Sequence, residues 1–259
     1  MHQHDSERAA PAWLHDDRIQ VVDEVLGLLK TGKEAEVFIV ERRNARGEER
    51  VLLAHKRYRP TKVTTKGELE ALGFTKARGF TNDLIYHEGR RFRRSREQRA
   101  VERMTDYGKR VLAERWPGQE LDVLTRAHSA GVTVPYPVEF TGDGMLMQLI
   151  GDDQGAAPRL VNARLSRAQL QRAYEQLLDE LSALTRSGLV HADLSPFNVL
   201  WWEDRMWLID FPQSVDLATN PHGFGLLHHD VTTMCAWFNR HGVDTDAEEV
   251  FAELLAEAW

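Results

Sequence analysis

The chain has 259 residues and a formal net charge of −7, and 42% of its residues are hydrophobic and 28% charged. This length allows one large or two small domains with a sizeable core, and the acidic charge gives no global attraction to nucleic acid. A membrane-spanning helix is excluded because no apolar run reaches about 18 residues. The single cysteine, Cys235, excludes an internal disulfide and a cysteine-based zinc site. We expect a cytoplasmic protein, since the first residues lack the apolar region of a secretory signal.

The first half of the chain is expected to be rich in strands. Residues 1–17 are polar and predict a flexible tail. Apolar residues with helical spacing in 19–29, followed by Gly32, predict a short amphipathic helix. The next two apolar runs, VFIV at 37–40 and VLLA at 51–54, predict a hairpin that turns at 44–47.

The rest of this half is less regular. Residues 57–115 are polar with few apolar anchors, which predicts mixed helix and flexible loop. A helix through 121–127 is expected to end at Gly131. The sequence VPYPVEF and the sequence GDGMLMQLIG then predict two strands joined at 141–144.

The second half is expected to be mainly helical. Ser166 is a suitable N-cap for a long helix with leucines along one face, and Gly188 is placed to end it. The segment VLWWEDRMWLID predicts a hairpin that turns at 203–205, and helices follow around 224–240 and 245–258. Asp244 or Thr245 is expected to cap the last helix. A strand-rich half followed by a helical half predicts an α+β protein with two lobes around a cleft.

The strongest local pattern is HADLSPFN at 191–198, followed by an apolar strand that ends at Asp210. Phosphoryl transfer from ATP needs a carboxylate near the accepting hydroxyl and oxygen ligands that hold Mg²⁺ on the phosphates. Asp193 suits the first role, and Asn198 with Asp210 suits the second. The spacing H-x-D-x-x-x-x-N, then a strand, then Asp is typical of kinase-like folds.

A kinase-like fold requires further groups upstream. Lys56 ends a predicted strand, as a phosphate-contacting lysine should, and a helical glutamate should hold it. Glu120 is the preferred partner and Glu114 is the competitor. The segment MLMQLIG is expected to connect the lobes, with backbone groups near Gln148 and Ile150 placed to bind adenine; an edge strand is the other interpretation.

Together, TGKEAEVF, AHK, MQLIGDD, HADLSPFNVL, IDFPQSVD and LLHHD resemble the RIO family of atypical serine/threonine kinases and ATPases over residues 25–240. The resemblance implies a bilobal protein-kinase-like fold, binding of ATP with Mg²⁺ or Mn²⁺, and a flexible loop at about 60–115. It also implies that the nucleotide site includes Gly32, Lys33, Glu34, Val37, Ala54 and Ser195. Asp210 is a candidate acceptor of an aspartyl-phosphate, as in some members of the family.

The resemblance gives three segments: a tail at 1–17, an N-lobe at 18–150 and a C-lobe at 151–259. Ser195 stands where typical protein kinases have a lysine, and no A-P-E motif follows Asp210. Only 49 residues follow Asp210, which is few for a conventional peptide-docking surface. A conventional peptide-recognition surface is therefore not expected. The expected partners are ATP and, as substrate, an unknown protein or the chain itself.

Two other functions remain open. A small-molecule phosphotransferase of the aminoglycoside or choline type shares H-x-D-x-x-x-x-N, although the short C-terminal part and TGKEA favour the RIO family. The second alternative function is that of a module that binds RNA or protein and is switched by nucleotide. Its contact would be residues 90–99, which hold six arginines and one acid. This run could meet RNA or a ribosomal particle, or could be a solvated charged surface.

The stretch GLLKTGKE at 27–34 also matches the P-loop pattern G-x-x-x-x-G-K-[ST] except at its last position, which is Glu34. A P-loop joins a strand to a following helix, whereas here a helix is expected before Gly32 and a strand after it. We therefore interpret the match as coincidental.

Overall fold

The computed structural model describes residue 14 and residues 19–32, 35–44, 47, 49–59 and 119–258. Predictions for residues 60–115, including the arginine run at 90–99 and the competing Glu114, lie outside these ranges, as do those for Lys33 and Glu34. Among the described helices, none is both long and apolar enough to cross a membrane.

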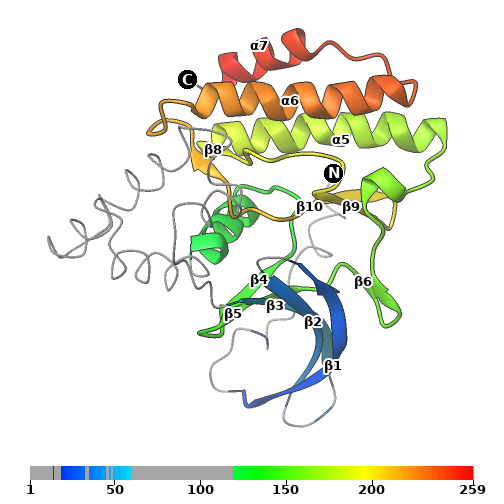
Figure 1. Ribbon diagram of the computed structural model, residues 1–259, viewed down its shortest axis with the longest axis vertical. Coiled ribbons are helices and arrows are strands. Elements are labelled where there is room, and N and C mark those ends of the chain that lie inside the picture. The colour runs from blue at the N-terminus through cyan, green and yellow to red at the C-terminus, as the bar shows by residue number, and fades with distance from the viewer. Residues whose placement is uncertain are drawn as a thin grey trace, which may run out of the picture.

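An antiparallel five-stranded sheet forms one end of the molecule, and helices form the other (Figure 1). The strand order is β1-β2-β3-β5-β4. The bounds are β1 Val21–Thr31, β2 Ala35–Asn44, β3 Arg50–Tyr58, β4 Pro137–Phe140 and β5 Gly144–Gln148. The protein is therefore an α+β protein with the kinase-like arrangement that the sequence predicts.

The predicted hairpin is confirmed as β2 and β3, in which Ile39 pairs with Ala54. Its turn is closed by the Gly47 N–H, which donates to the Asn44 carbonyl at 2.8 Å, and Gly47 has a φ of 69°. Glycine adopts this left-handed conformation without a Cβ clash. On one face of the sheet, Val40 and Leu53 are buried against Leu146 of β5.

The helix predicted at 19–29 is wrong, because this segment is the edge strand β1. Its three valines, Val21, Val22 and Val25, are β-branched and favour extended backbone. The pairing of β1 with β2 shifts register between Val25 and Gly27 and again between Leu28 and Lys30. These two bulges break the alternation that marks a strand and leave an apolar spacing that resembles a helix. The P-loop is still excluded, because a strand and not a helix follows Gly32.

Residues 119–129 are helical and lie between the sheet and the C-terminal helices in Figure 1. Leu124 and Ala127 are buried in the main hydrophobic core. The helix ends before Gly131, whose φ is 84°, and the Val132 N–H donates back to the Ala127 carbonyl at 3.1 Å. The predicted helix and its glycine stop are thus confirmed.

The C-terminal part contains three long helices, α5 Arg167–Arg186, α6 Gly223–Arg240 and α7 Ala247–Glu257, which stack side by side in Figure 1. Ser166 caps α5 in a reciprocal capping box with Gln169, as the sequence predicts for this N-cap. Leu177, Leu181 and Leu184 of α5 are each at most 2% exposed. Cys235 of α6 is also buried.

The cap predicted for the last helix is wrong by one or two positions. Asp246 caps α7, and its carboxylate accepts from the N–H groups of Glu248 and Glu249. The Thr245 hydroxyl instead donates to the Cys235 carbonyl of α6 at 3.2 Å. Three adjacent residues of capping type made this choice ambiguous in the sequence.

Short elements connect the two ends. They are β6 Gly151–Asp152, β7 Gly155–Ala156, the 3₁₀ helix η3 Leu160–Asn162, β8 Leu189–Val190, β9 Val199–Trp202, β10 Arg205–Leu208 and β11 Val215–Asp216. The predicted hairpin is confirmed as β9 and β10, and its turn residues Glu203 and Asp204 have φ values of 50° and 61°. Strand β8 pairs with β11, which fixes the two ends of the segment from 189 to 216 on each other.

Candidate active site

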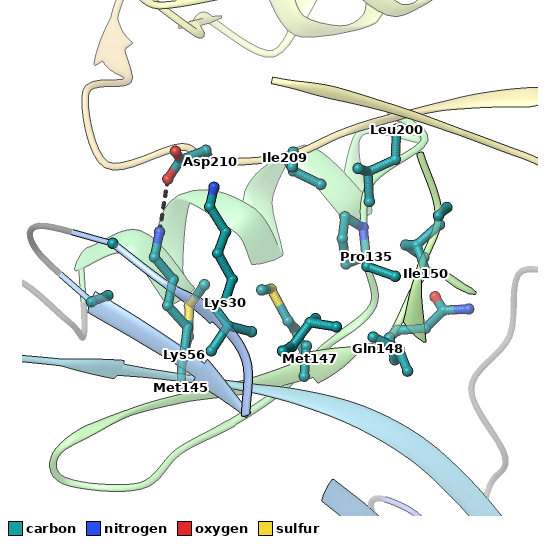
Figure 2. A pocket seen from close by; sticks show the side chains of 18 of the residues that line it. Lys30, Lys56, Pro135, Met145, Met147, Gln148, Ile150, Leu200, Ile209 and Asp210 are labelled. Atoms are coloured by element: carbon teal, nitrogen blue, oxygen red, sulfur yellow. Dashed lines mark hydrogen bonds and ion pairs between the residues drawn. The ribbon is translucent and has the colours of Figure 1, made fainter. Parts of the chain in front are cut away.

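A cleft of about 610 Å³ lies between the sheet and the C-terminal part, and Figure 2 shows many of its side chains. Strand β3 supplies Ala54, Lys56 and Tyr58, because alternate residues of a strand point to the same face. Strand β5 and its extension supply a largely apolar wall. The lining residues from these and other elements include Leu29, Gly32, Val37, Leu124, Met145, Met147, Gln148, Ile150, Leu200, Ile209 and Asp210.

Lys56 lies between two carboxylates. Its Nζ is 2.7 and 3.0 Å from the two carboxylate oxygens of Glu120 and 2.8 Å from Oδ1 of Asp210. Figure 2 shows the Lys56 ammonium reaching Asp210 across the cleft. Burial alone would lower the pKa of Lys56, but the charges of Glu120 and Asp210 outweigh it and raise that pKa. Lys56 therefore stays protonated and links the sheet, the helix at 119–129 and the strand end at Asp210.

Glu120 is 3% exposed and also accepts from the Tyr58 hydroxyl. The structure thus places Glu120 where a lysine-holding glutamate was predicted.

Asp210 follows β10 in a strained backbone conformation, with a φ of 71°. Its side chain is 44% exposed, so the carboxylate faces the cleft. Burial works to raise its pKa, but the charge of Lys56 and the hydrogen bond from it lower that pKa below the ordinary value. Asp210 therefore presents an ionised carboxylate to the cleft.

The loop after β8 carries Asp193. The Asn198 side-chain amide donates to Oδ2 of Asp193 at 3.0 Å and to the Asp193 carbonyl at 2.8 Å. Partial burial raises the pKa of Asp193, and the nearby Asp210 adds to this, although the bond from Asn198 opposes it. The backbone of Ile209 donates to the Asn198 carbonyl at 3.0 Å, so this loop is fixed beside the residue that precedes Asp210.

Asp230 of α6 also holds the loop that carries Asp193. Its carboxylate accepts from the N–H of Ala192 at 2.8 Å and from the N–H of Leu194 at 2.9 Å, one on each side of Asp193. Asp230 is 1% exposed, and burial raises its pKa to about 7. Ala192 has a φ of 67°, an uncommon value for alanine that these bonds help to maintain. The sequence reasoning assigned Asp230 no role, although it is the aspartate of LLHHD.

His191 is a structural residue here. Its Nε2 bonds to the Ile209 carbonyl at 3.1 Å, and its ring packs on Phe211 with a centroid distance of 4.6 Å. Burial lowers its pKa to about 4, so the ring is neutral at pH 7. Its Nδ1 has no hydrogen-bond partner within the described part of the chain. The side chain therefore ties the loop of Asp193 to the strand end of Asp210.

The far end of the cleft offers backbone groups at Gln148 and Ile150. The Gln148 N–H is used within the sheet, since it donates to the Tyr136 carbonyl at 2.9 Å. The Ile150 carbonyl accepts from Ala157 at 2.8 Å, whereas its N–H has no partner among the described residues. Ile150 can thus donate one hydrogen bond to a flat apolar ligand that lies along this wall.

Asn198 and Asp210 fit a magnesium site by the chemistry of their donors. The Asn198 amide nitrogen bonds to Asp193, which leaves its oxygen as a ligand, and Asp210 offers an ionised carboxylate. Within the described ranges, no group of three or more His, Cys, Asp or Glu side chains is placed to hold a metal. Mg²⁺ takes one or two protein oxygens and fills its other positions with water and substrate phosphates, so the two oxygen donors of Asn198 and Asp210 would suffice for it.

The structure brings most predicted residues to one place. Gly32, Val37, Ala54, Lys56, Glu120, Gln148, Ile150 and Asp210 line the cleft. Among the described lining residues we do not find Asp193, Ser195 or Asn198, which lie on the adjoining loop. In that loop the Ser195 carbonyl accepts from the Asn198 N–H at 2.8 Å and shapes the turn.

Comparison with known proteins identifies the family. A family model described as the RIO domain matches residues 79–250. The chain belongs to the RIO family. This RIO sequence is 36% identical over 146 residues to serine/threonine-protein kinase RIO3 of Mus musculus, a match covering 56% of this chain and 28% of that protein.

Two further relatives extend the comparison. Serine/threonine-protein kinase RIO1 of Caenorhabditis elegans is 32% identical over 218 residues, covering 84% of this chain and 37% of the relative. RIO-type serine/threonine-protein kinase Rio1 of Haloferax volcanii is 33% identical over 146 residues, covering 56% and 49%. The match thus spans less than half the length of each of these three relatives.

Proposed function

We propose that this RIO protein is an ATP-dependent phosphotransferase that acts on serine or threonine hydroxyls. The observation that carries the proposal is the position of Lys56, which bonds to both Glu120 and Asp210 at one end of a nucleotide-sized cleft. The names of the relatives, all serine/threonine-protein kinases, support the same activity.

In this proposal the adenine ring lies against the apolar wall formed by Ala54, Met147 and Leu200. The unpartnered N–H of Ile150 donates to a ring nitrogen, and the phosphates extend toward Lys56. Lys56 donates to phosphate oxygens from a position that Glu120 fixes. Because these groups are in place before ATP binds, little reorganisation is needed during transfer.

Asn198 and Asp210 would hold Mg²⁺ or Mn²⁺, which neutralises phosphate charge when bound. Asp193 faces the acceptor and receives its hydroxyl proton as the oxygen attacks the γ-phosphorus and the bond to the leaving ADP breaks. The raised pKa of Asp193 makes its carboxylate a better proton acceptor than an ordinary aspartate. The bond from Asn198 keeps this carboxylate in one orientation.

Asp210 is exposed to the cleft and ionised, which supports a second reaction in which Asp210 itself accepts the phosphate. We propose that a carboxylate oxygen of Asp210 can attack the γ-phosphorus itself, forming an acyl phosphate as the bond to the leaving ADP breaks. Hydrolysis then releases phosphate and restores the carboxylate, which amounts to ATPase activity. The acceptor in the transferase reaction is an unidentified protein or the chain itself, and contact with RNA or a ribosomal particle through residues 90–99 remains a prediction.

The test uses γ-labelled ATP with Mg²⁺ and separates label on protein, free phosphate, and label on added aminoglycosides or choline. We expect the label to appear on the protein or as free phosphate. Without divalent metal, we expect neither labelled product. Transfer to an added small molecule would show the alternative phosphotransferase instead. Absence of both turnover and nucleotide binding would contradict the proposed function.

The acyl phosphate has its own signature. Label on Asp210 should be released by hydroxylamine and should be lost in Asp210→Asn but persist in Asp193→Ala. Asp244→Asn is a matched control, because Asp244 is exposed just after α6 and outside the cleft lining. Protein label that resists hydroxylamine in every variant would contradict the acyl phosphate and leave transfer to hydroxyls.

A further inference from the structure

Two cations of the cleft have no part in the mechanism above. Lys30 lies on β1, where it pairs with Val37 of β2, and its side chain lines the cleft. Figure 2 shows it extending from the sheet toward Asp210, beside Lys56. Arg159 lies between β7 and η3, forms a bridge with Leu200 and lines the cleft as well.

The charges of these side chains act on each other. Burial lowers the pKa of Lys30, and the charge of Arg159 lowers it further, whereas Asp210 works in the opposite direction. Among the described residues, the ion pairs of the cleft lining join Lys56 to Glu120 and to Asp210, and neither involves Lys30 or Arg159. The charge of Lys56, in contrast, is balanced by the carboxylates of Glu120 and Asp210. Lys30 and Arg159 are thus two cations of the cleft whose charges act on each other, with Asp210 near Lys30.

Their contribution decides the sign of the cleft's charge. Three cations, Lys30, Lys56 and Arg159, face two carboxylates, Glu120 and Asp210, which leaves a net charge of +1. Without Lys30 and Arg159 the remaining groups would carry −1. A protein surface of that sign would repel a polyphosphate before any metal is bound.

We propose that Lys30 and Arg159 bind phosphate oxygens of the nucleotide, Lys30 from β1 and Arg159 from the segment before η3. This inference rests on the proposed function of the cleft and adds two ligand-binding residues to it. The two side chains select for the polyphosphate, because an uncharged nucleoside offers them nothing to neutralise. Phosphate binding also relieves the repulsion between them.

The test measures dissociation constants of ATP, ADP and adenosine without activity as a readout. The variants are Lys30→Met, Arg159→Met and Lys30→Arg, with Arg240→Met as control, since Arg240 is exposed at the end of α6 and outside the cleft lining. Loss of one charge-assisted bond should weaken ATP binding about ten- to hundredfold. Adenosine binding should change less than about twofold. Lys30→Arg and Arg240→Met should both bind ATP as the wild type does.

Thermal melting gives a second readout. Removal of either cation relieves the repulsion between Lys30 and Arg159. Without nucleotide, Lys30→Met and Arg159→Met should therefore melt at no lower a temperature than the wild type. Their stabilisation by saturating ATP should be smaller.

Equal affinity of wild type and Lys30→Met for ATP would overturn the proposal for Lys30 while leaving the nucleotide site intact. Equal loss of ATP and adenosine binding would also overturn it, since that pattern indicates damage to the pocket. Failure of the wild type to bind any nucleotide would instead contradict the proposed function.

Discussion

Replacing Asp230 should separate loop positioning from nucleotide binding. Its carboxylate is buried and accepts from the N–H groups of Ala192 and Leu194 on either side of Asp193. Asp230→Ala leaves both donors buried without acceptors. Each unsatisfied buried N–H costs about 1–3 kcal/mol, so we expect a loss of about 2–6 kcal/mol in the free energy of unfolding.

Asp230→Asn is the more informative variant, because its single oxygen can still accept one of the two bonds. We expect roughly half of the stability loss and a reduced transfer rate, since the loop of Asp193 loses one of its two restraints. ATP affinity should stay near that of the wild type, because Asp230 does not line the cleft.

Urea unfolding followed by tryptophan fluorescence measures the stability, and titration with ATP measures the affinity. Asp244→Asn is the control, since it makes the same chemical change at an exposed site on the same lobe. If Asp230→Asn were as stable and as active as the control, the two hydrogen bonds would not position the loop and the reasoning would fail.

Three further outcomes are expected. Burial lowers the pKa of His191 to about 4, so the unfolded chain binds more protons than the folded one between pH 6.5 and 4. The free energy of unfolding should therefore fall by up to about 3 kcal/mol on acidification through this range, and His191→Gln should remove that part of the pH slope. Lys56→Ala should reduce ATP turnover far more than Lys33→Ala, and the opposite ranking would revive the P-loop interpretation. Ser166→Ala should cost about 1 kcal/mol in urea unfolding by removing the cap of α5, without changing ATP affinity; an unchanged unfolding midpoint would contradict the role of the cap.

The sequence predicted best the elements with a regular apolar pattern or a distinct stop signal. The helix α5 has both, since Ser166 begins it and Gly188, with a φ of 73°, follows its end. The hairpin of β9 and β10 was equally clear because two apolar runs flank a short polar turn. In these segments the local preference and the tertiary packing agree.

Strand β1 was mispredicted because local and tertiary preferences differ there. It is an edge strand, and Val22, Leu26 and Leu28 remain 61%, 49% and 55% exposed. A strand that is exposed on both faces and interrupted by bulges shows no alternation of apolar and polar residues. Its pairing with β2 decides its conformation, and this pairing cannot be read from the segment alone.

The site was predicted from motif spacing, which identifies residue types but not contacts between distant parts of the chain. Lys56 and Asp210 are 154 positions apart and meet at 2.8 Å. The prediction from sequence missed Lys30 because it expected a helix at 19–29, just before that residue, and not a strand that carries Lys30 to the cleft. It missed Asp230 because a buried aspartate in an apolar helix acts through backbone groups that only the fold brings near.

The proposed transfer requires Asp193 to take the proton of the acceptor while the cleft binds ATP. The most direct test is single-turnover transfer of labelled γ-phosphate to hydroxyl groups by wild type, Asp193→Ala and the control Asp244→Ala, with the ATP dissociation constant measured on the same samples. We expect Asp193→Ala to transfer the phosphate at least about 100-fold more slowly than the wild type, with unchanged ATP affinity. Transfer by Asp193→Ala at the rate of the control would contradict it.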